Sequence, residues 1–165
     1  MNKTLSRKIE NKKEVFAWSM YDFANQPFTN LVVTFIYGTF FTTVIASNEI
    51  EGTQQWSHAV SITAIIVALL SPVMGAVADR GGYRKMFMFG FTWLTIVATT
   101  VLYFVLPGEV YRALFWFVIA NIGFEMGSVF CNAYLPDISH SKNIGRISGY
   151  GWSLGYVGGL IALAL

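Results

Sequence analysis

Residues 75–85 read Gly-Ala-Val-Ala-Asp-Arg-Gly-Gly-Tyr-Arg-Lys and place four charges in a short turn between two uncharged apolar runs. Such a turn belongs at a membrane surface. Asp79 falls near the C-terminal end of one predicted helix, and Arg84 and Lys85 fall near the start of the next, so each sign is wrong for its own helix dipole. We therefore expect Asp79 to have a partner outside its helix, and the glycines to provide a sharp reversal and close backbone approach.

The composition points to a membrane protein. Of the 165 residues, 55% are hydrophobic, 16% are aromatic and only 12% are charged, which is too apolar for an ordinary soluble domain. The net charge of +2 is concentrated in a few loops, which argues against a nucleic-acid partner. The single cysteine, Cys131, excludes an internal disulfide, and its apolar setting predicts a packed thiol.

The sequence carries no pattern that predicts catalysis or a bound cofactor. Its two histidines, His58 and His140, have no set of ligating side chains around them in the sequence, so we expect no metal site. It also lacks a Ser/His/Asp pattern and a phosphate-binding glycine loop. We expect a protein that is not an enzyme.

Five apolar segments predict an all-α, polytopic membrane helix bundle. The expected spans are 15–46, 58–78, 86–106, 111–135 and a fifth from residue 149 onward. We expect residues 1–14 to form a cytoplasmic N-terminal segment and residues 15–165 to form the N-terminal transmembrane bundle. Because the fifth segment is still apolar at its last residue, we expect a fragment of a longer protein whose C-terminal half is missing.

The basic residues predict the orientation of the bundle. Ten of the eleven Lys and Arg residues fall in the N-terminal segment, the turn after the second span or the loop after the fourth, and only Arg112 falls on the other side. Cytoplasmic loops are enriched in Lys and Arg, so the N-terminus should be cytoplasmic. Three tryptophans near the expected span ends fit an interfacial aromatic belt: Trp18, Trp56 and Trp152.

A polar stripe on the fourth span is the first candidate for a functional site. Asn121, Glu125, Ser128 and Asn132 recur at helical spacing, and Glu125 falls near the middle of the bilayer. Ionisable groups at that depth are costly and are functional candidates, so this stripe should line a substrate cavity or couple to a proton. The alternative is an interhelical hydrogen-bond ladder that contains a protonated Glu125.

The first span carries a second polar stripe. Asp22, Asn25, Gln26 and Thr29 share one helical face, and Pro27 is able to loosen the backbone there. If the helix tilts, Asp22 lines the mouth of a cavity. If it does not, Asp22 is a solvated carboxylate in the cytoplasmic interface, and both alternatives stay open.

The fifth segment carries glycines on one face, which permit close approach of another helix. They are Gly151, Gly155, Gly158 and Gly159. Simple packing is one interpretation of this face, and a sliding or hinge surface is the other.

The turn at residues 75–85 resembles the signature of the major facilitator superfamily between its second and third helices. The signature requires a glycine, an acidic and a basic residue, a second glycine and two further basic residues. The matching positions are Gly75, Asp79, Arg80, Gly82, Arg84 and Lys85. Residues 21–25 (YDFAN), 132–138 (NAYLPDI) and 148–156 (SGYGWSLGY) are similar to the vacuolar amino-acid effluxer branch related to autophagy proteins, and to its bacterial relatives.

This resemblance implies a transporter of two six-helix halves that works by alternating access around a central cavity. The chain would supply helices 1 to 4 and part of helix 5. Asp79 would contact a helix in the second half and hold the cytoplasmic gate shut, with Arg80 and Arg84 in the same charge network. Helix 4 lacks the membrane arginine of the superfamily's proton antiporters, and the fifth segment lacks their proline, which speaks against proton antiport by that route.

We therefore predict a secondary active transporter of small solutes, with amino acid efflux as the candidate activity. Its expected partners are the lipid bilayer, a small-molecule solute and the C-terminal half of the same transporter. The expected location is the bacterial inner membrane. The alternative is a membrane scaffold or assembly subunit that transports nothing.

Overall fold

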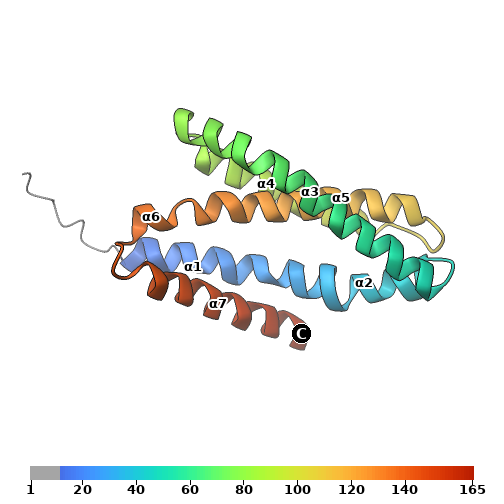
Figure 1. Ribbon diagram of the computed structural model, residues 1–165. Helices are drawn as coiled ribbons and strands as arrows, with labels where there is room; N and C mark the ends of the chain where they lie inside the picture. Colours follow the sequence, from blue (N-terminus) through green and yellow to red (C-terminus); the bar gives the residue numbers. More distant parts are fainter. Residues whose placement is uncertain (1–11) are drawn as a thin grey trace, which may run out of the picture.

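The computed structural model describes residues 12–165, which form a bundle of long helices (Figure 1). The segment predicted over 1–14 lies almost entirely outside the described residues. In chain order the elements are α1 Lys12–Pro27, η1 Phe28–Phe35, α2 Tyr37–Phe40, η2 Phe41–Ile45, α3 Glu49–Gly81, α4 Arg84–Leu102, α5 Val110–Asn132, α6 Leu135–Ile138 and α7 Ile144–Ala164.

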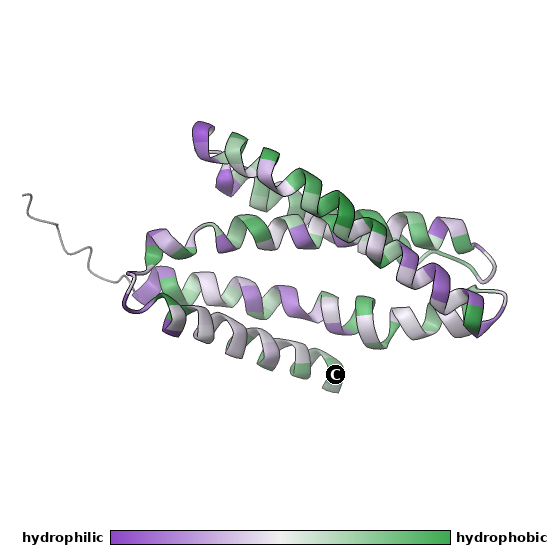
Figure 2. Cartoon of the chain, in the orientation of Figure 1, coloured by the Kyte–Doolittle hydropathy of each residue, from purple (hydrophilic) through white to green (hydrophobic). Residues whose placement is uncertain are grey.

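Four helical segments are long and apolar enough to cross a membrane, and they confirm the predicted all-α membrane bundle. These segments are Lys12–Ile45, Glu49–Gly81, Arg84–Leu102 and Val110–Ile138. Figure 2 shows long hydrophobic stretches in these segments, hydrophilic residues at several of their ends, and hydrophilic residues also within α1 and α5. The glycine-rich α7 is not one of these four, although its 21 residues are enough to cross a bilayer core of about 30 Å.

Two helices begin earlier than the hydropathy pattern predicted. Helix α3 begins at Glu49 rather than residue 58, because Asn48 accepts a hydrogen bond from the Glu51 amide at 2.9 Å and caps the helix. Helix α7 begins at Ile144 rather than residue 149. The first turns of both helices are polar, and hydropathy marks only the apolar part of a helix. The hydropathy pattern therefore placed both helix starts too late.

The first span, Lys12–Ile45, is one long segment with two π-helical stretches, η1 and η2. The first π-helical stretch begins directly after Pro27. Proline has no amide hydrogen to donate, so the carbonyl of Phe23 loses the partner that an α-helix would provide. Proline is thus able to loosen this part of the backbone, and π-helical stretches are frequent at functional sites.

Helix α5 packs against α4 and α3, and α1 packs along α7 (Figure 1). Two of the tryptophans expected at the membrane interface also join helices. The Trp18 indole donates to the Cys131 carbonyl at 2.9 Å, and the Trp56 indole donates to the Val33 carbonyl at 3.2 Å. Trp56 also packs against Phe117, with ring centroids 3.8 Å apart and the ring planes tilted by 31°. Polar contacts of this kind hold helices together in an apolar solvent.

Candidate functional site

A cavity of about 300 Å³ joins the polar stripes of the first and fourth spans. Its walls come from α1 with η1, from α5 and from α7. The lining residues are Asp22, Asn25, Gln26, Thr29, Phe124, Glu125, Ser128, Asn132, Trp152 and Tyr156. Six of the seven residues predicted for the substrate site are therefore brought together, and they come from segments about 100 residues apart in the sequence.

Glu125 lines this cavity as an exposed side chain. Within the described part of the chain it makes no hydrogen bond or ion pair, so these residues contain no closed ladder around it. Its neighbour one turn away, Ser128, accepts a hydrogen bond from the Asn25 side chain at 3.3 Å. This bond ties the two stripes to each other and leaves the Glu125 carboxyl group open to the cavity.

Asn121 is the one predicted residue of the α5 stripe that lies away from the cavity. Its side chain is buried, with an exposed fraction of 5%, and it does not line the cavity. Nearby, a Cβ on Gly123 would come within 2.6 Å of the Thr95 hydroxyl, so α5 lies very close to α4 at this level. Asn121 is therefore a buried residue of the bundle and not part of the cavity wall.

Asp22 lines the same cavity as Glu125, as expected if the first span tilts. It lies ten residues after the start of α1, which corresponds to about 15 Å along the helix axis. Its neighbour Tyr21 points elsewhere, with its hydroxyl 2.9 Å from the Thr92 hydroxyl of α4. Of the two alternatives for Asp22, the geometry thus favours a carboxylate that lines the cavity over a carboxylate that is solvated in the cytoplasmic membrane interface.

Helix α7 contributes two aromatic residues that the sequence reasoning did not assign to the site. Trp152 and Tyr156 lie one turn apart, with ring centroids 6.0 Å apart, and both line the cavity. Trp152 and Tyr156 are four residues apart, so they share a helical face, and this face lies next to the glycine face of α7. That spacing was the signal that could have assigned both residues to the site.

The glycine face of α7 packs on α1 and η1. A Cβ on Gly158 would clash with the Phe23 carbonyl, and one on Gly159 would clash with the Asn30 side chain. A Cβ on Gly151 would come within 2.6 Å of the Trp18 ring. Around Gly155 the contacts are looser, at 3.6 Å or more. These contacts support the packing interpretation of the glycine face.

The cavity has a simple electrostatic character. Its lining includes two carboxyl groups, three side-chain amides and two hydroxyls from serine and threonine, and it includes no Lys, Arg or His. The described residues also contain no group of three or more acidic, Cys or His side chains that could hold a metal ion. Such a lining suits a proton or an organic ammonium group better than an anion.

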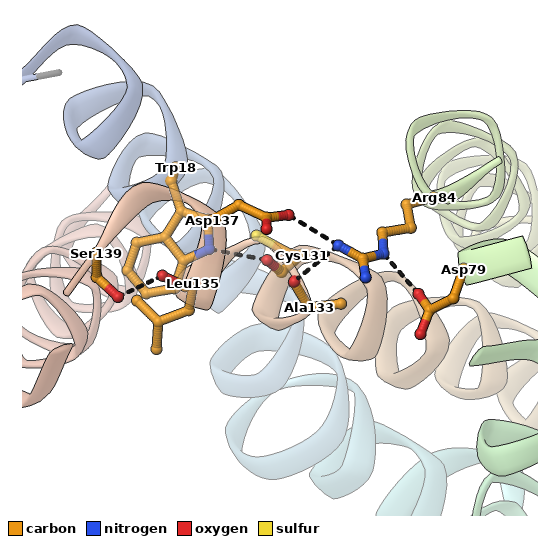
Figure 3. A network of polar contacts seen from close by, with 8 residues as sticks. All are labelled: Trp18, Asp79, Arg84, Cys131, Ala133, Leu135, Asp137 and Ser139. Atoms are coloured by element: carbon orange, nitrogen blue, oxygen red, sulfur yellow. Dashed lines mark hydrogen bonds and ion pairs between the residues drawn. The ribbon is translucent and has the colours of Figure 1, made fainter. Parts of the chain in front are cut away.

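The second candidate site is the charged turn between α3 and α4. The Arg84 guanidinium donates to Asp79 at 2.6 Å, to Asp137 at 2.8 Å and to the Ala133 carbonyl at 3.3 Å (Figure 3). Arg84 thereby joins the end of α3 to α6 and the end of α5. The two charges of wrong sign pair with each other across the turn, so Asp79 has its partner outside its own helix, as predicted.

The network differs from the prediction at other positions. Asp137 was not assigned a role, although it lies in one of the stretches that carried the family resemblance. Arg80 is exposed and forms no ion pair with the described residues, so its part in the gate network stays a prediction. Lys85 instead lines a separate groove beside Asp137.

The turn glycines have different roles. Gly82 has φ of 66°, a left-handed conformation that ends α3 and lets the chain reverse. A Cβ on Gly75 would meet nothing within 4 Å among the described residues. Close backbone approach at Gly75 therefore stays a prediction for a helix outside this chain.

The comparisons with known proteins point to transporters. A family model described as "Vacuole effluxer Atg22 like" matches residues 45–165. The chain is 31% identical over 153 residues to "Uncharacterized MFS-type transporter YxiO" of Bacillus subtilis, covering 90% of this chain and 36% of that protein. It is 34% identical over 79 residues to "Autophagy-related protein 22" of Coccidioides immitis, covering 48% of this chain and 13% of that protein.

A third relative, an "Uncharacterized protein" of Aquifex aeolicus, is 32% identical over 154 residues, covering 92% of this chain and 38% of that protein. The chain thus spans less than two fifths of the length of these relatives. No solved structure matches the chain.

Proposed function

The chain belongs to the vacuole effluxer Atg22-like family of multi-pass membrane proteins, and we propose that it forms part of the N-terminal half of a secondary transporter. This transporter moves a small solute by alternating access. The observation that carries the proposal is the cavity that joins the polar stripes of α1 and α5. Ionisable side chains inside membrane-spanning segments mark solute or ion pathways.

The solute that fits this cavity best carries an amine, as amino acids do. Asp22 and Glu125 supply two carboxylates without a neighbouring cation in the lining. Trp152 and Tyr156 supply aromatic faces, which attract ammonium groups. In this proposal Glu125 binds either the amine or a coupling proton, and the C-terminal half of the transporter supplies the opposite wall.

Solute flux in vesicles that contain the full-length protein tests the role of Glu125. Losing a charge-assisted hydrogen bond costs about 1.5–3 kcal/mol, so Glu125→Gln should reduce amino acid flux by about 10- to 100-fold. The matched control is Glu49→Gln, in the exposed first turn of α3 and away from the cavity. Full flux with unchanged pH dependence in Glu125→Gln would show that Glu125 does not bind the solute or the proton.

We further propose that the Arg84 network is the cytoplasmic gate of this transporter. Arg84 fixes the turn next to Asp79, and Asp79 is then positioned to meet a helix of the second half when the gate closes. Asp79→Asn should shift the population toward the inward-open state. Thiol labelling of single cysteines on the two faces measures this shift, and identical labelling in the variant and the parent protein would contradict the gate.

The proposed orientation has the start of α1, the α3–α4 turn and the α6–α7 connection on the cytoplasmic side. These three regions lie at the same end of the bundle (Figure 1), and they carry ten of the eleven basic residues together with the N-terminal segment. In a bacterial inner membrane, reporter fusions after Lys142 and after Gly108 should give cytoplasmic and external signals, respectively. The reverse result would exclude this orientation.

A further inference from the structure

Three oxygen atoms of α1 converge on one point beside α7. A Cβ on Gly155 would lie 3.6 Å from the carbonyl oxygen of Asp22, 3.7 Å from its carboxylate oxygen Oδ2 and 3.7 Å from the side-chain oxygen Oε1 of Gln26. Asp22 and Gln26 are one helical turn apart, so they share the face of α1 that packs on α7. Because Gly155 has no side chain, a small space remains between these oxygens and the α7 backbone.

The space beside Gly155 is closed along α7 in both directions. One turn before it, a Cβ on Gly151 would come within 2.6 Å of the Trp18 ring, whose indole is already held by a hydrogen bond. One turn after it, a Cβ on Gly159 would clash with the Asn30 side chain. The space is therefore about one helical turn long, which suits a single small ion better than the carbon skeleton of a solute.

The three oxygens have no donor between them. The side chains of Asp22 and Gln26 make no hydrogen bond or ion pair with any residue that the structure describes. The Asp22 carbonyl has a second lone pair beside the one that its helical hydrogen bond uses. Acceptor oxygens that face one another in a region of low dielectric repel each other unless a cation or a donor lies between them.

We propose that the space beside Gly155 binds Na⁺. Its ligands are the carboxylate and the carbonyl of Asp22 and the side-chain oxygen of Gln26. Both residues also line the cavity of about 300 Å³, so water from the cavity can complete the coordination. Na⁺ balances the single carboxylate, whereas a divalent ion would leave an uncompensated charge inside the membrane.

The backbone of the first span supports this choice of ion. The span is interrupted by a π-helical stretch directly after Pro27, one residue beyond Gln26. In secondary transporters, carbonyl groups at interrupted membrane helices coordinate Na⁺. The interruption therefore lies where the ligands of the proposed ion are found.

Na⁺ at Asp22 would also complete the recognition of an amino acid. The cavity lining contains no Lys, Arg or His for the carboxylate of such a solute, and Na⁺ would supply the missing positive charge. Glu125 comes from α5 and is not among the atoms near Gly155, so it stays available for the amine. This coupling role rests on the proposed function, but the binding of Na⁺ does not.

Thermal melting of the full-length protein in detergent, without solute, tests the ion site. The salts are sodium chloride, potassium chloride and choline chloride at the same ionic strength. Na⁺ should raise the melting temperature by about 2–4 °C relative to choline. Asp22→Asn should raise the Na⁺ concentration for half of this effect at least about ten-fold, because the ion loses its charged ligand.

Gly155→Ala tests the space itself. The new Cβ would make only ordinary contacts, so the melting temperature without Na⁺ should not fall, yet the methyl group would occupy the place of the ion. We therefore expect a loss of at least about ten-fold in apparent Na⁺ affinity. Gly149→Ala is the matched control on the same helix, because a Cβ there meets nothing within 4 Å. Its Na⁺ dependence should stay within about two-fold of the parent protein.

Gln26→Leu keeps the test decisive if Asp22→Asn fails to fold, because it removes a neutral ligand and should also weaken the effect of Na⁺. Equal melting temperatures in sodium and choline chloride would overturn the site, and an equal effect of potassium would show that it does not select Na⁺. Unchanged Na⁺ dependence in Gly155→Ala and Gln26→Leu would place the ion elsewhere. Intact Na⁺ binding without any solute flux would instead contradict only the transport proposal.

Discussion

Replacing Gly158 by alanine should force α7 away from α1. The new Cβ would clash with the Phe23 carbonyl oxygen and would lie 3.0 Å from its carbonyl carbon. Both atoms belong to the backbone, so they cannot rotate away, and the cost should be about 3 kcal/mol, the upper end for overpacking. Since α7 also carries Trp152 and Tyr156, the same displacement should widen the cavity and lower solute flux.

Gly149→Ala on the same helix is the matched control, because a Cβ there would meet nothing within 4 Å. Both substitutions gain about 1 kcal/mol of helix propensity, so the difference between the two variants isolates the packing cost. The assay is denaturant unfolding of the full-length protein in detergent. Equal free energies of unfolding for Gly158→Ala and Gly149→Ala would refute the close contact of α1 with α7.

Three further predictions concern polar contacts outside the cavity. Arg84→Gln should lower the free energy of unfolding by only about 1 kcal/mol, because its carboxylate partners are more than half exposed; a loss above ~3 kcal/mol would contradict this. Trp18→Phe should cost about 1 kcal/mol, because the Cys131 carbonyl loses the indole donor at 2.9 Å but keeps the Tyr134 amide at 3.1 Å, and unchanged unfolding would exclude that role. A backbone amide and then an arginine hold the pKa of Glu109 below its ordinary value of 4.5. The unfolded state therefore binds the proton more readily, so the stabilisation by Glu109 is complete above about pH 4.5 and is lost as the pH falls through its lower folded pKa. The stability difference between the parent protein and Glu109→Gln should vanish at low pH, and a difference independent of pH would contradict this.

The periodicity of polar residues predicted the faces of the helices but not how they meet. Residues three or four apart share a helical face, so the stripes that contain Asp22 and Glu125 could be predicted from spacing alone. That both stripes line one cavity follows from the packing of α1, α5 and α7, for which the sequence has no local signal. For the same reason Trp152 and Tyr156 were not assigned to the site.

Local sequence also left some features of the backbone unpredicted. The spacing around Pro27 indicated a loosened helix but not π-helical stretches. Hydropathy placed the start of α3 at residue 58 because the capped turn after Asn48 is polar. The sign of the charge at Asp79 required a partner outside its helix, and the family resemblance put Arg84 in the same charge network, but only the fold shows that Arg84 pairs with Asp79 directly.

The central claim is that the polar stripes of α1 and α5 face one aqueous cavity that holds the solute. The most direct test is thiol labelling of Ser128→Cys in a full-length protein without other cysteines, with Ala98→Cys in the buried core as the control. Our account predicts that a membrane-impermeant reagent labels Ser128→Cys and that a transported amino acid protects it, whereas Ala98→Cys stays unlabelled. The claim would be contradicted if neither cysteine were labelled, or if no solute changed the labelling of Ser128→Cys.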